Sequence, residues 1–228
     1  MKRSDTKSAP LFDEKSVLMP PDARREFELA VGVLRRAFTS GSLAQLDSCV
    51  RHPQITMPRV RALNAARRVL PAMPLEIGPK FGISEGLLLT TLRLTDGTHR
   101  PVAMERQKGG YLLDWESLTG WCDMSFTELL TRPPAGEVLM RVHSRPSSAQ
   151  SPFAGEKGVS LTLSHPAEKS TLSAFVPDTL LKSGGAAGAL EDARGTPFTL
   201  RVRADAGSTE QGWVRVTGII CTGWVTDQ

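Results

Sequence analysis

Asp114 and Glu116 are the residues of this chain whose type and spacing point most directly to acid–base chemistry. If the segment around them is an extended strand, both carboxylates project from one face and Trp115 projects from the other. A carboxylate in a desolvated pocket can then act as a general base. The alternative is that Trp115 lies in the core, while both carboxylates face outward, where they cap a helix or form ion pairs with Arg100 or Arg106 on the neighbouring strand. The sequence favours this alternative, because no histidine or tyrosine can be assigned as a catalytic partner.

No motif for a metal, a nucleotide or a covalent nucleophile is found elsewhere in the sequence. The glycine-rich stretch 183–188 lacks the lysine and hydroxyl residue that hold phosphate in a P-loop, so it is interpreted as a flexible helix. The histidines have no HxxxH spacing, and the cysteines form no CxxC pair. These residues are His52, His99, His143, His165, Cys49, Cys122 and Cys221. The sequence therefore predicts neither a metal site nor a cofactor.

The charge and the hydropathy of the chain narrow the function classes further. The net charge is +4 over 228 residues, whereas a nucleic-acid-binding surface usually concentrates its basic residues on one face. No secretory signal is recognisable near the N-terminus, and no apolar run approaches the roughly 20 residues of a membrane span. We therefore expect a cytoplasmic protein with no membrane span, for which nucleic acid is a disfavoured partner.

Apolar residues recur at helical spacing in three segments of the N-terminal part, and each segment would bury one stripe. These segments begin near Asp22, Ser42 and Pro58. The preceding residues, 1–21, are polar and contain three prolines. We expect a disordered or loosely docked tail there.

The hydrophobic period changes from helical to alternating after Pro71, which indicates strands. Between two of these strands, Asp96-Gly97 is a hairpin turn signal. Helices followed by an antiparallel meander predict an α+β domain, in which the helices cover one face of a curved sheet.

A short helix and a proline pair mark the expected domain boundary. Ser125-x-x-Glu128 is a capping box, and the proline pair that begins at Pro133 ends the helix. We therefore place the first domain at 22–134 and the second at 135–228. The second domain reads as three strands, a weak helix and two strands, which predicts a small five-stranded barrel.

The two predicted domains resemble known architectures. Residues 22–121 resemble the NTF2-like cone, in which helices pack inside a bent sheet, and the second domain resembles the OB fold. The chain also resembles an uncharacterised bacterial two-domain family, through Asp114-Trp115-Glu116, Trp121 and Ser125-Phe126. This resemblance implies an architecture and no particular activity.

These observations favour a non-catalytic scaffold or partner-binding protein, whose partner would be another protein or a second copy of the chain. The candidate pocket or interdomain site consists of Asp114, Trp115, Glu116 and Trp121. Trp121 and the helix that begins at Ser125 would form the interdomain contact.

Two other functions remain open from the sequence. The first is a small-molecule-binding or lyase- or isomerase-like cone enzyme that uses Asp114 or Glu116. The second is a weak single-stranded nucleic-acid binder that uses the barrel. The strands that would bind the bases offer only Phe175 for stacking and almost no charge, which disfavours this second alternative.

Overall fold

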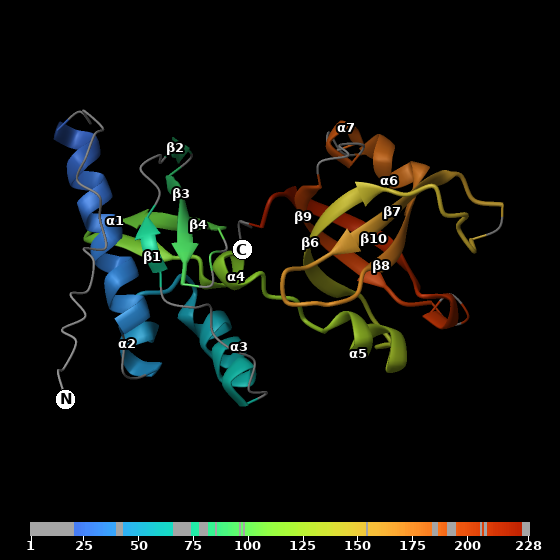
Figure 1. The fold of residues 1–228 in the computed structure, drawn as a ribbon, viewed down its shortest axis with the longest axis horizontal. Coiled ribbons are helices and arrows are strands. Elements are labelled where there is room, and N and C mark those ends of the chain that lie inside the picture. The colour runs from blue at the N-terminus through green and yellow to red at the C-terminus, as the bar shows by residue number, and fades with distance from the viewer. Residues whose placement is uncertain are drawn as a thin grey trace, which may run out of the picture. The chain divides into compact units, whose positions relative to one another are not determined.

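The computed structural model describes residues 21–39, 43–65, 74–77, 82–84, 86–95, 97, 99–153, 155–183, 187–190, 195–205, 207 and 209–224. The expected tail over 1–21 lies outside these residues except for Pro21, where the first helix begins. The chain divides into two compact units, 1–119 and 120–228, each with its own hydrophobic core. Figure 1 shows the elements of both units.

Three helices open the first unit, as the sequence predicts: α1 (Pro21–Thr39), α2 (Leu43–Asp47) and α3 (Pro53–Ala65). The apolar stripe of α1 is buried at Ala30, Val33 and Leu34. α3 begins at Pro53 rather than near Pro58, which lies inside the helix. Proline is well suited to the first turn of a helix, because its missing N–H would have no intrahelical partner there.

The first unit continues into an antiparallel sheet formed by β1 (Pro74–Ile77), β2 (Gly82–Ser84), β3 (Leu87–Leu94), β4 (His99–Gln107) and β5 (Gly110–Leu113). The order is β1-β3-β4-β5, and β2 also pairs with β3. In β3, Leu88 and Leu92 are buried while Leu89 is exposed on the other face. The expected turn is found at Gly97, which adopts a φ of 82°, while Asp96 lies outside the described residues.

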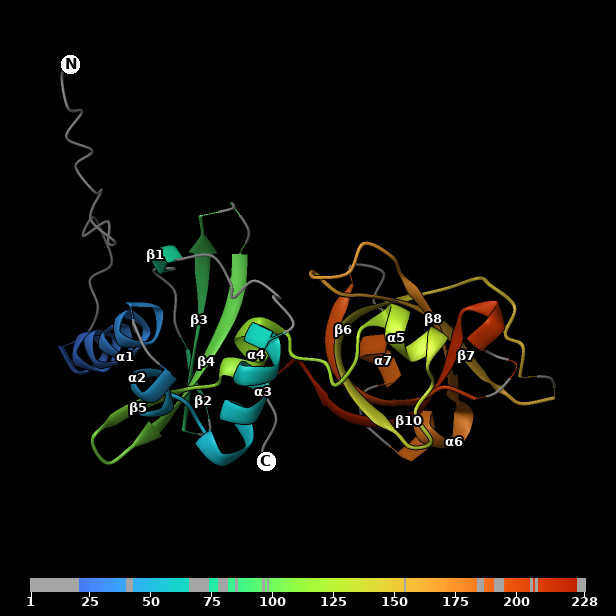
Figure 2. The ribbon, with the colours of Figure 1, turned by 90° about the horizontal axis from the view of Figure 1, so that it is seen from below.

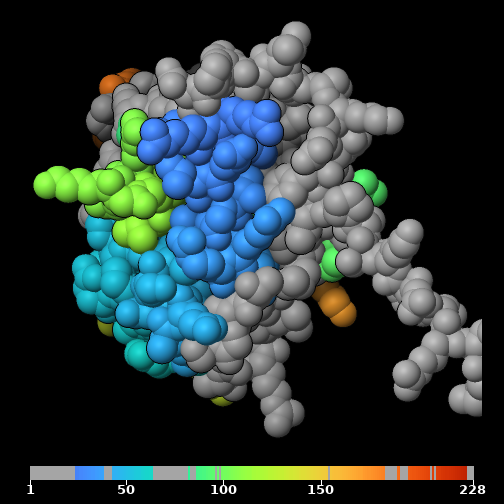
Figure 3. Space-filling view, turned by 90° about the vertical axis from the view of Figure 1, so that its left-hand side faces the viewer, coloured from blue at the N-terminus to red at the C-terminus, as the bar shows by residue number. Residues whose placement is uncertain are grey.

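The core of the first unit joins α1 to the sheet. At the rim of this core, the Tyr111 hydroxyl donates to Glu26 Oε2 at 2.6 Å, and Arg106 Nη2 donates to Glu26 Oε1 at 2.7 Å. Figure 3 shows α1 at the surface with the β4–β5 hairpin beside it. The hairpin is therefore fastened to α1 by polar contacts as well as by apolar packing.

The prediction that Asp114, Trp115 and Glu116 lie on a strand is wrong. The strand ends at Leu113, and a short helix, α4 (Trp115–Thr119), follows. The Asp114 carboxylate accepts the backbone N–H of Ser117 at 2.8 Å, and the Ser117 hydroxyl donates to the Asp114 carbonyl at 3.0 Å. Aspartate is a favoured N-cap, and this local pairing starts a helix where side-chain alternation suggested a strand. The argument that two carboxylates share one face of a strand therefore does not apply.

The second unit is a closed barrel of β6 (Val138–Pro146), β7 (Gly158–Ser164), β8 (Leu172–Pro177), β9 (Thr196–Arg203) and β10 (Trp213–Thr222). The ring runs β10-β8-β7-β6-β9 and closes between β9 and β10. β8 and β10 pair in parallel, and the other pairs are antiparallel. Two short helices and a 3₁₀ turn lie between the last strands: α6 (Asp178–Ser183), α7 (Ala187–Leu190) and η1 (Thr209–Gln211). The predicted order of three strands, a helical part and two strands is confirmed.

Helices cover the two ends of the barrel. The helix α5 (Phe126–Thr131) lies at one end, and α6 and α7 lie at the other (Figures 1 and 2). Phe126 and Leu129 of α5 and Leu190 of α7 belong to the barrel core. The predicted capping box at Ser125 is confirmed, because its hydroxyl accepts the Glu128 N–H at 3.1 Å and the Glu128 carboxylate accepts the Ser125 N–H at 2.9 Å.

The structural division of the chain differs from the predicted boundary at residues 134 and 135. The two units meet between Thr119 and Gly120, so α5 belongs to the second unit. The reason is that the apolar face of α5 is buried in the barrel core through Phe126 and Leu129. The proline pair at Pro133 ends the helix, but it does not separate the two cores.

The Tyr111 contact provides a spectroscopic test of the packing between α1 and the sheet. Burial, and then the hydrogen bond and charge of Glu26, raise the pKa of Tyr111 from 10.0 to about 12. Stability from this group is therefore complete below pH 10 and is lost as the pH rises through about 12. Because Tyr111 is the only tyrosine, phenolate absorbance after rapid pH jumps reports on this group alone.

We expect the native midpoint near 12, and a lower midpoint in Glu26→Gln that still stays above 10, because burial is the larger cause. Protein unfolded in denaturant is the control and should titrate at the ordinary value. A native midpoint equal to that of the unfolded control would contradict the described contact.

Candidate functional site

Arg51 is placed beside the start of α4 by the backbone of the segment that precedes α3. The Leu113 N–H donates to the Cys49 carbonyl at 2.7 Å, and the Arg51 N–H donates to the Leu113 carbonyl at 2.9 Å. Val50 thereby forms a parallel bridge with Leu113 at the end of β5. The side chain of Arg51 consequently lies next to Asp114, which immediately follows this bridge.

Arg51 joins a carboxylate of β4 to the carboxylate at the start of α4. Its Nη1 donates to Asp114 Oδ2 at 3.0 Å, and its Nε donates to Glu105 Oε2 at 2.6 Å. Arg51 and Asp114 are 7% and 3% exposed, so this pair is removed from water. Gln107 Nε2 donates to the other oxygen of Glu105 at 2.6 Å. One guanidinium therefore connects β4, the start of α4 and the segment before α3.

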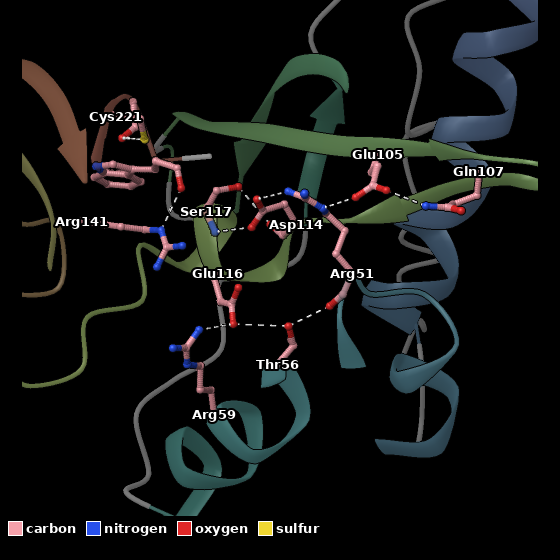
Figure 4. Close-up of polar contacts among 12 residues, drawn as sticks. Arg51, Thr56, Arg59, Glu105, Gln107, Asp114, Glu116, Ser117, Arg141 and Cys221 are labelled. Atoms are coloured by element: carbon pink, nitrogen blue, oxygen red, sulfur yellow. Dashed lines mark hydrogen bonds and ion pairs between the residues drawn. The ribbon is translucent and has the colours of Figure 1, made fainter. Parts of the chain in front are cut away.

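Glu116 forms a second ion pair, directed toward α3. Arg59 Nη1 donates to Glu116 Oε1 at 2.6 Å. The buried Thr56 hydroxyl lies 3.3 Å from the same oxygen and 2.9 Å from the Arg51 carbonyl, so its single proton is shared by two acceptors. Figure 4 shows Asp114 pointing toward Arg51 and Glu116 pointing toward Thr56 and Arg59. The two carboxylates therefore bind separate partners and do not converge on one reacting atom.

The ion pairs expected from the sequence involve other arginines. Arg106 pairs with Glu26, and Arg100 lies opposite Leu92 in the register of β3 and β4. The expectation that the carboxylates are ion-paired holds, but the partners come from residues 51 and 59. The expectation that both carboxylates face outward is wrong, because Asp114 and Glu116 are buried against these partners. The helical segment that supplies Arg59 was visible in the sequence, but the approach of Arg51 depends on the fold.

His52 is an unusual residue that the sequence did not single out as part of the site. Its φ of 42° lies in the left-handed region, and it is the non-glycine residue with positive φ in the described part of the chain. Its Nε2 is buried and has no hydrogen-bond partner among the described residues. The backbone turn is stabilised because the Ile55 and Thr56 N–H groups both donate to the His52 carbonyl. This turn fixes the direction in which the chain leaves Arg51 and enters α3.

The four predicted site residues lie in different units. Asp114, Trp115 and Glu116 belong to the first unit, and Trp115 is 3% exposed, which confirms that it is a buried residue. Trp121 belongs to the second unit, where it is partly exposed and its carbonyl accepts Arg141 Nη1 at 3.0 Å. The interdomain role expected of Trp121 stays a prediction.

Arg141 is the buried polar centre of the second unit. Its side chain is 0% exposed, and its Nε donates to the Trp224 carbonyl at 2.8 Å. Cys122 packs beside it, with the Arg141 N–H donating to Cys122 Sγ at 3.3 Å. Burial raises the pKa of the Cys122 thiol to about 12, so this thiol stays protonated and unreactive at neutral pH. The sequence did not identify this centre, because an arginine among alternating residues of a strand normally faces solvent.

Searches for known relatives give no functional assignment. A scan against known protein families finds no match, and a search of curated proteins finds no significantly similar sequence. Within the described residues, no group of three or more histidine, cysteine, aspartate or glutamate side chains could hold a metal ion. None of the described helices is long and apolar enough to cross a membrane.

The Arg51 network predicts an asymmetry between two substitutions. In Asp114→Asn the asparagine can still cap α4, and Glu105 still compensates Arg51, so we expect a loss of about 1.5–3 kcal/mol for a charged hydrogen bond. In Arg51→Met the cation shared by Asp114 and Glu105 is lost, and a buried unpaired charge costs about 3–5 kcal/mol. Urea unfolding of both variants measures these losses, and Arg24→Met at the exposed α1 surface is the control.

The double variant Arg51→Met/Asp114→Asn should be more stable than Arg51→Met alone, because it no longer buries the unpaired aspartate. Equal stability of Asp114→Asn and Arg51→Met would contradict the network. The network would also be contradicted if the loss of stability in the double variant equalled the sum of the losses in the two single variants.

The two tryptophans of the predicted site should differ in their importance for stability. Trp115→Ala removes a buried side chain, and such truncations cost about 3–5 kcal/mol. Trp121→Ala should cost less, because Trp121 is partly exposed and contacts Arg141 through its backbone carbonyl, which alanine retains. Denaturant unfolding of the two variants makes the comparison. A larger loss in Trp121→Ala would show that the two roles are reversed.

Proposed function

We propose that this chain is a non-catalytic scaffold or partner-binding protein with an NTF2-like α+β unit and an OB-like barrel. The observation that carries the proposal is the pairing of both candidate carboxylates with arginines. Asp114 accepts from Arg51 and from the backbone of α4, and Glu116 accepts from Arg59 and Thr56. A general base needs a lone pair directed at its substrate, whereas these oxygens are engaged in holding the fold.

Two structural features support the proposed architectures. The barrel closes in the order first, second, third, fifth and fourth strand, with a parallel third–fifth pair and helices after the third strand. This closed five-stranded arrangement supports an OB-like barrel. In the first unit, α1 packs on an antiparallel sheet that follows the helices in sequence. Both architectures serve many functions, so the argument for binding rests on the site and not on the fold.

Selection of displayed peptides on the immobilised full-length chain tests the proposal. We expect enrichment of polypeptide ligands that bind saturably in solution, with affinities that Asp114→Asn leaves unchanged while the variant stays folded. A thermal-shift screen with small metabolites tests the enzyme alternative in parallel. A metabolite that stabilises the wild type but not folded Asp114→Asn would overturn the proposal in favour of the cone enzyme, and so would the absence of any polypeptide ligand.

A further inference from the structure

The outer face of the barrel carries an aromatic residue that the chain itself covers. Ala174 and Val176 of β8 face the barrel core, so alternation along the strand directs Phe175 outward. Phe175 is nevertheless only 2% exposed. The Phe153 ring, from the β6–β7 connection, stacks on it with 5.2 Å between ring centroids and 27° between planes. The connection therefore folds over this face and hides the aromatic surface.

Arg215 of β10 completes the contact with the connection. Its guanidinium carbon lies 4.4 Å from the Phe153 ring centroid, and both of its terminal nitrogens donate to the Glu156 carboxylate at 2.6 Å. Asp205 accepts from Arg215 Nε at 3.2 Å and from Arg203 Nε at 2.7 Å, which fixes the plane of the Arg215 fork. The Arg215 hydrogen bonds lower the pKa of Glu156, which keeps this carboxylate ionised.

A tight turn brings Phe153 and Glu156 onto the same face. The Glu156 N–H donates to the Phe153 carbonyl at 3.3 Å, and Gly155 between them has a φ of 80°. The turn joins β7 at Gly158, where a Cβ atom would collide with the Val176 carbonyl and approach the Phe175 ring to 2.7 Å. The connection thus places one aromatic ring and, three residues later, one carboxylate against the outer face that Phe175 and Arg215 form.

The side-chain contacts that hold this segment lie at the surface. The aromatic stack and the cation–π contact are each worth little there. The two-pronged Arg215–Glu156 pair is a stronger type of contact, but its glutamate end is open to water. The Asp178 N–H also donates to the Lys157 carbonyl at 2.9 Å, at the end of the segment. The Glu156 side chain is 44% exposed, and none of the described residues of the segment belongs to the barrel core. A competing segment that offers the same two groups could therefore replace it.

The charge of the uncovered face favours a polypeptide over a nucleic acid. Without Glu156, the charged groups at the contact are Arg215, Arg203 and Asp205, with one net positive charge. The facing residues of β7 and β8 beside Phe175, Ser160 and Ser173, are uncharged. A single-stranded nucleic acid needs a series of cations along its phosphates, whereas one oriented arginine fork matches one carboxylate.

An open depression of about 320 Å³ continues the surface from Arg215 toward α6. It is lined by Pro177, Thr179, Leu180, Val216 and Thr217 beside Arg215. This depression has room for a further side chain of a bound segment, next to the aromatic ring and the carboxylate.

We propose that the outer face around Phe175 and Arg215 is a peptide-binding site, which the chain's own residues 151–153 and 155–157 occupy and which accepts a partner protein's segment in their place. The partner segment carries an aromatic residue followed three residues later by a carboxylate. The inference rests on the proposed partner-binding function and names its site and the chemistry of its ligand.

The test uses the full-length chain with Phe153→Ser/Glu156→Ser, which empties the face. The probe is a fluorescein-labelled peptide of residues 150–158, Gln-Ser-Pro-Phe-Ala-Gly-Glu-Lys-Gly, followed by anisotropy. We expect the emptied variant to bind it at least about tenfold more tightly than the wild type, because the tethered segment competes at a high effective concentration. Adding Arg215→Ser should abolish binding, and adding Arg201→Ser, on the neighbouring strand β9, should leave it unchanged.

Replacing phenylalanine by serine or glutamate by glutamine in the probe should also abolish binding. If Arg215→Ser does not fold, Arg215→Lys replaces it, because lysine keeps the charge and loses the two-pronged contact. Equal binding by wild type and emptied variant overturns the inference, and so does binding that survives the Arg215 substitution. Salt-dependent binding of an oligothymidylate in place of the peptide overturns it in favour of nucleic acid, and dimerisation of the emptied variant that excludes the peptide overturns it in favour of a second copy.

The result is separable from the test of the proposed function. If displayed peptides bind the full-length chain with affinities that Arg215→Ser does not change, partner binding stands and this site fails. If no polypeptide binds either the wild type or the emptied variant, both fail.

Discussion

The first unit depends on a single guanidinium that is shared by two carboxylates. Arg51 holds Asp114 and Glu105, which are 63 and 54 residues away in the sequence, and Arg51 and Asp114 have little access to water. A charge in such a place is stable only while it is paired, so the segment before α3, the edge of β4 and the start of α4 must form together. The Arg51 network takes the place of apolar packing beside the end of β5. Its carboxylates therefore stabilise the fold.

The second unit also buries an arginine, but the groups that accept its hydrogen bonds are different. Its interior is apolar, and the buried Arg141 is directed to backbone carbonyls instead of carboxylates. Around its outer face, Arg215 and Arg203 form ion pairs with Glu156 and Asp205. The first unit therefore pairs its buried arginine with carboxylates, whereas the second pairs its buried arginine with backbone carbonyls and keeps its carboxylate-paired arginines on the outer face.

Local signals in the sequence predict the parts of the fold that depend on neighbouring residues. The capping box at Ser125 and the order of the barrel elements follow from such signals. The helix at Asp114 was missed, because the same residues fit both a strand alternation and an aspartate N-cap, and only the pairing with Ser117 decides between them. Arg51 and Phe153 could not be assigned to their sites from the sequence. Their partners are distant in the sequence and come close only when the first unit folds and the barrel closes.

The Arg141–Trp224 contact has a consequence for how the protein is made. On the ribosome, Arg141 is synthesised long before the Trp224 carbonyl that accepts its hydrogen bond, and the ring cannot close until β9 and β10 follow β6. The first unit has all its strands as soon as Leu113 emerges, whereas the barrel core stays incomplete until almost the whole second unit has been translated. Vectorial synthesis thus leaves edges of the emerging barrel strands unpaired until the last strand is made, and such edges can pair with other chains.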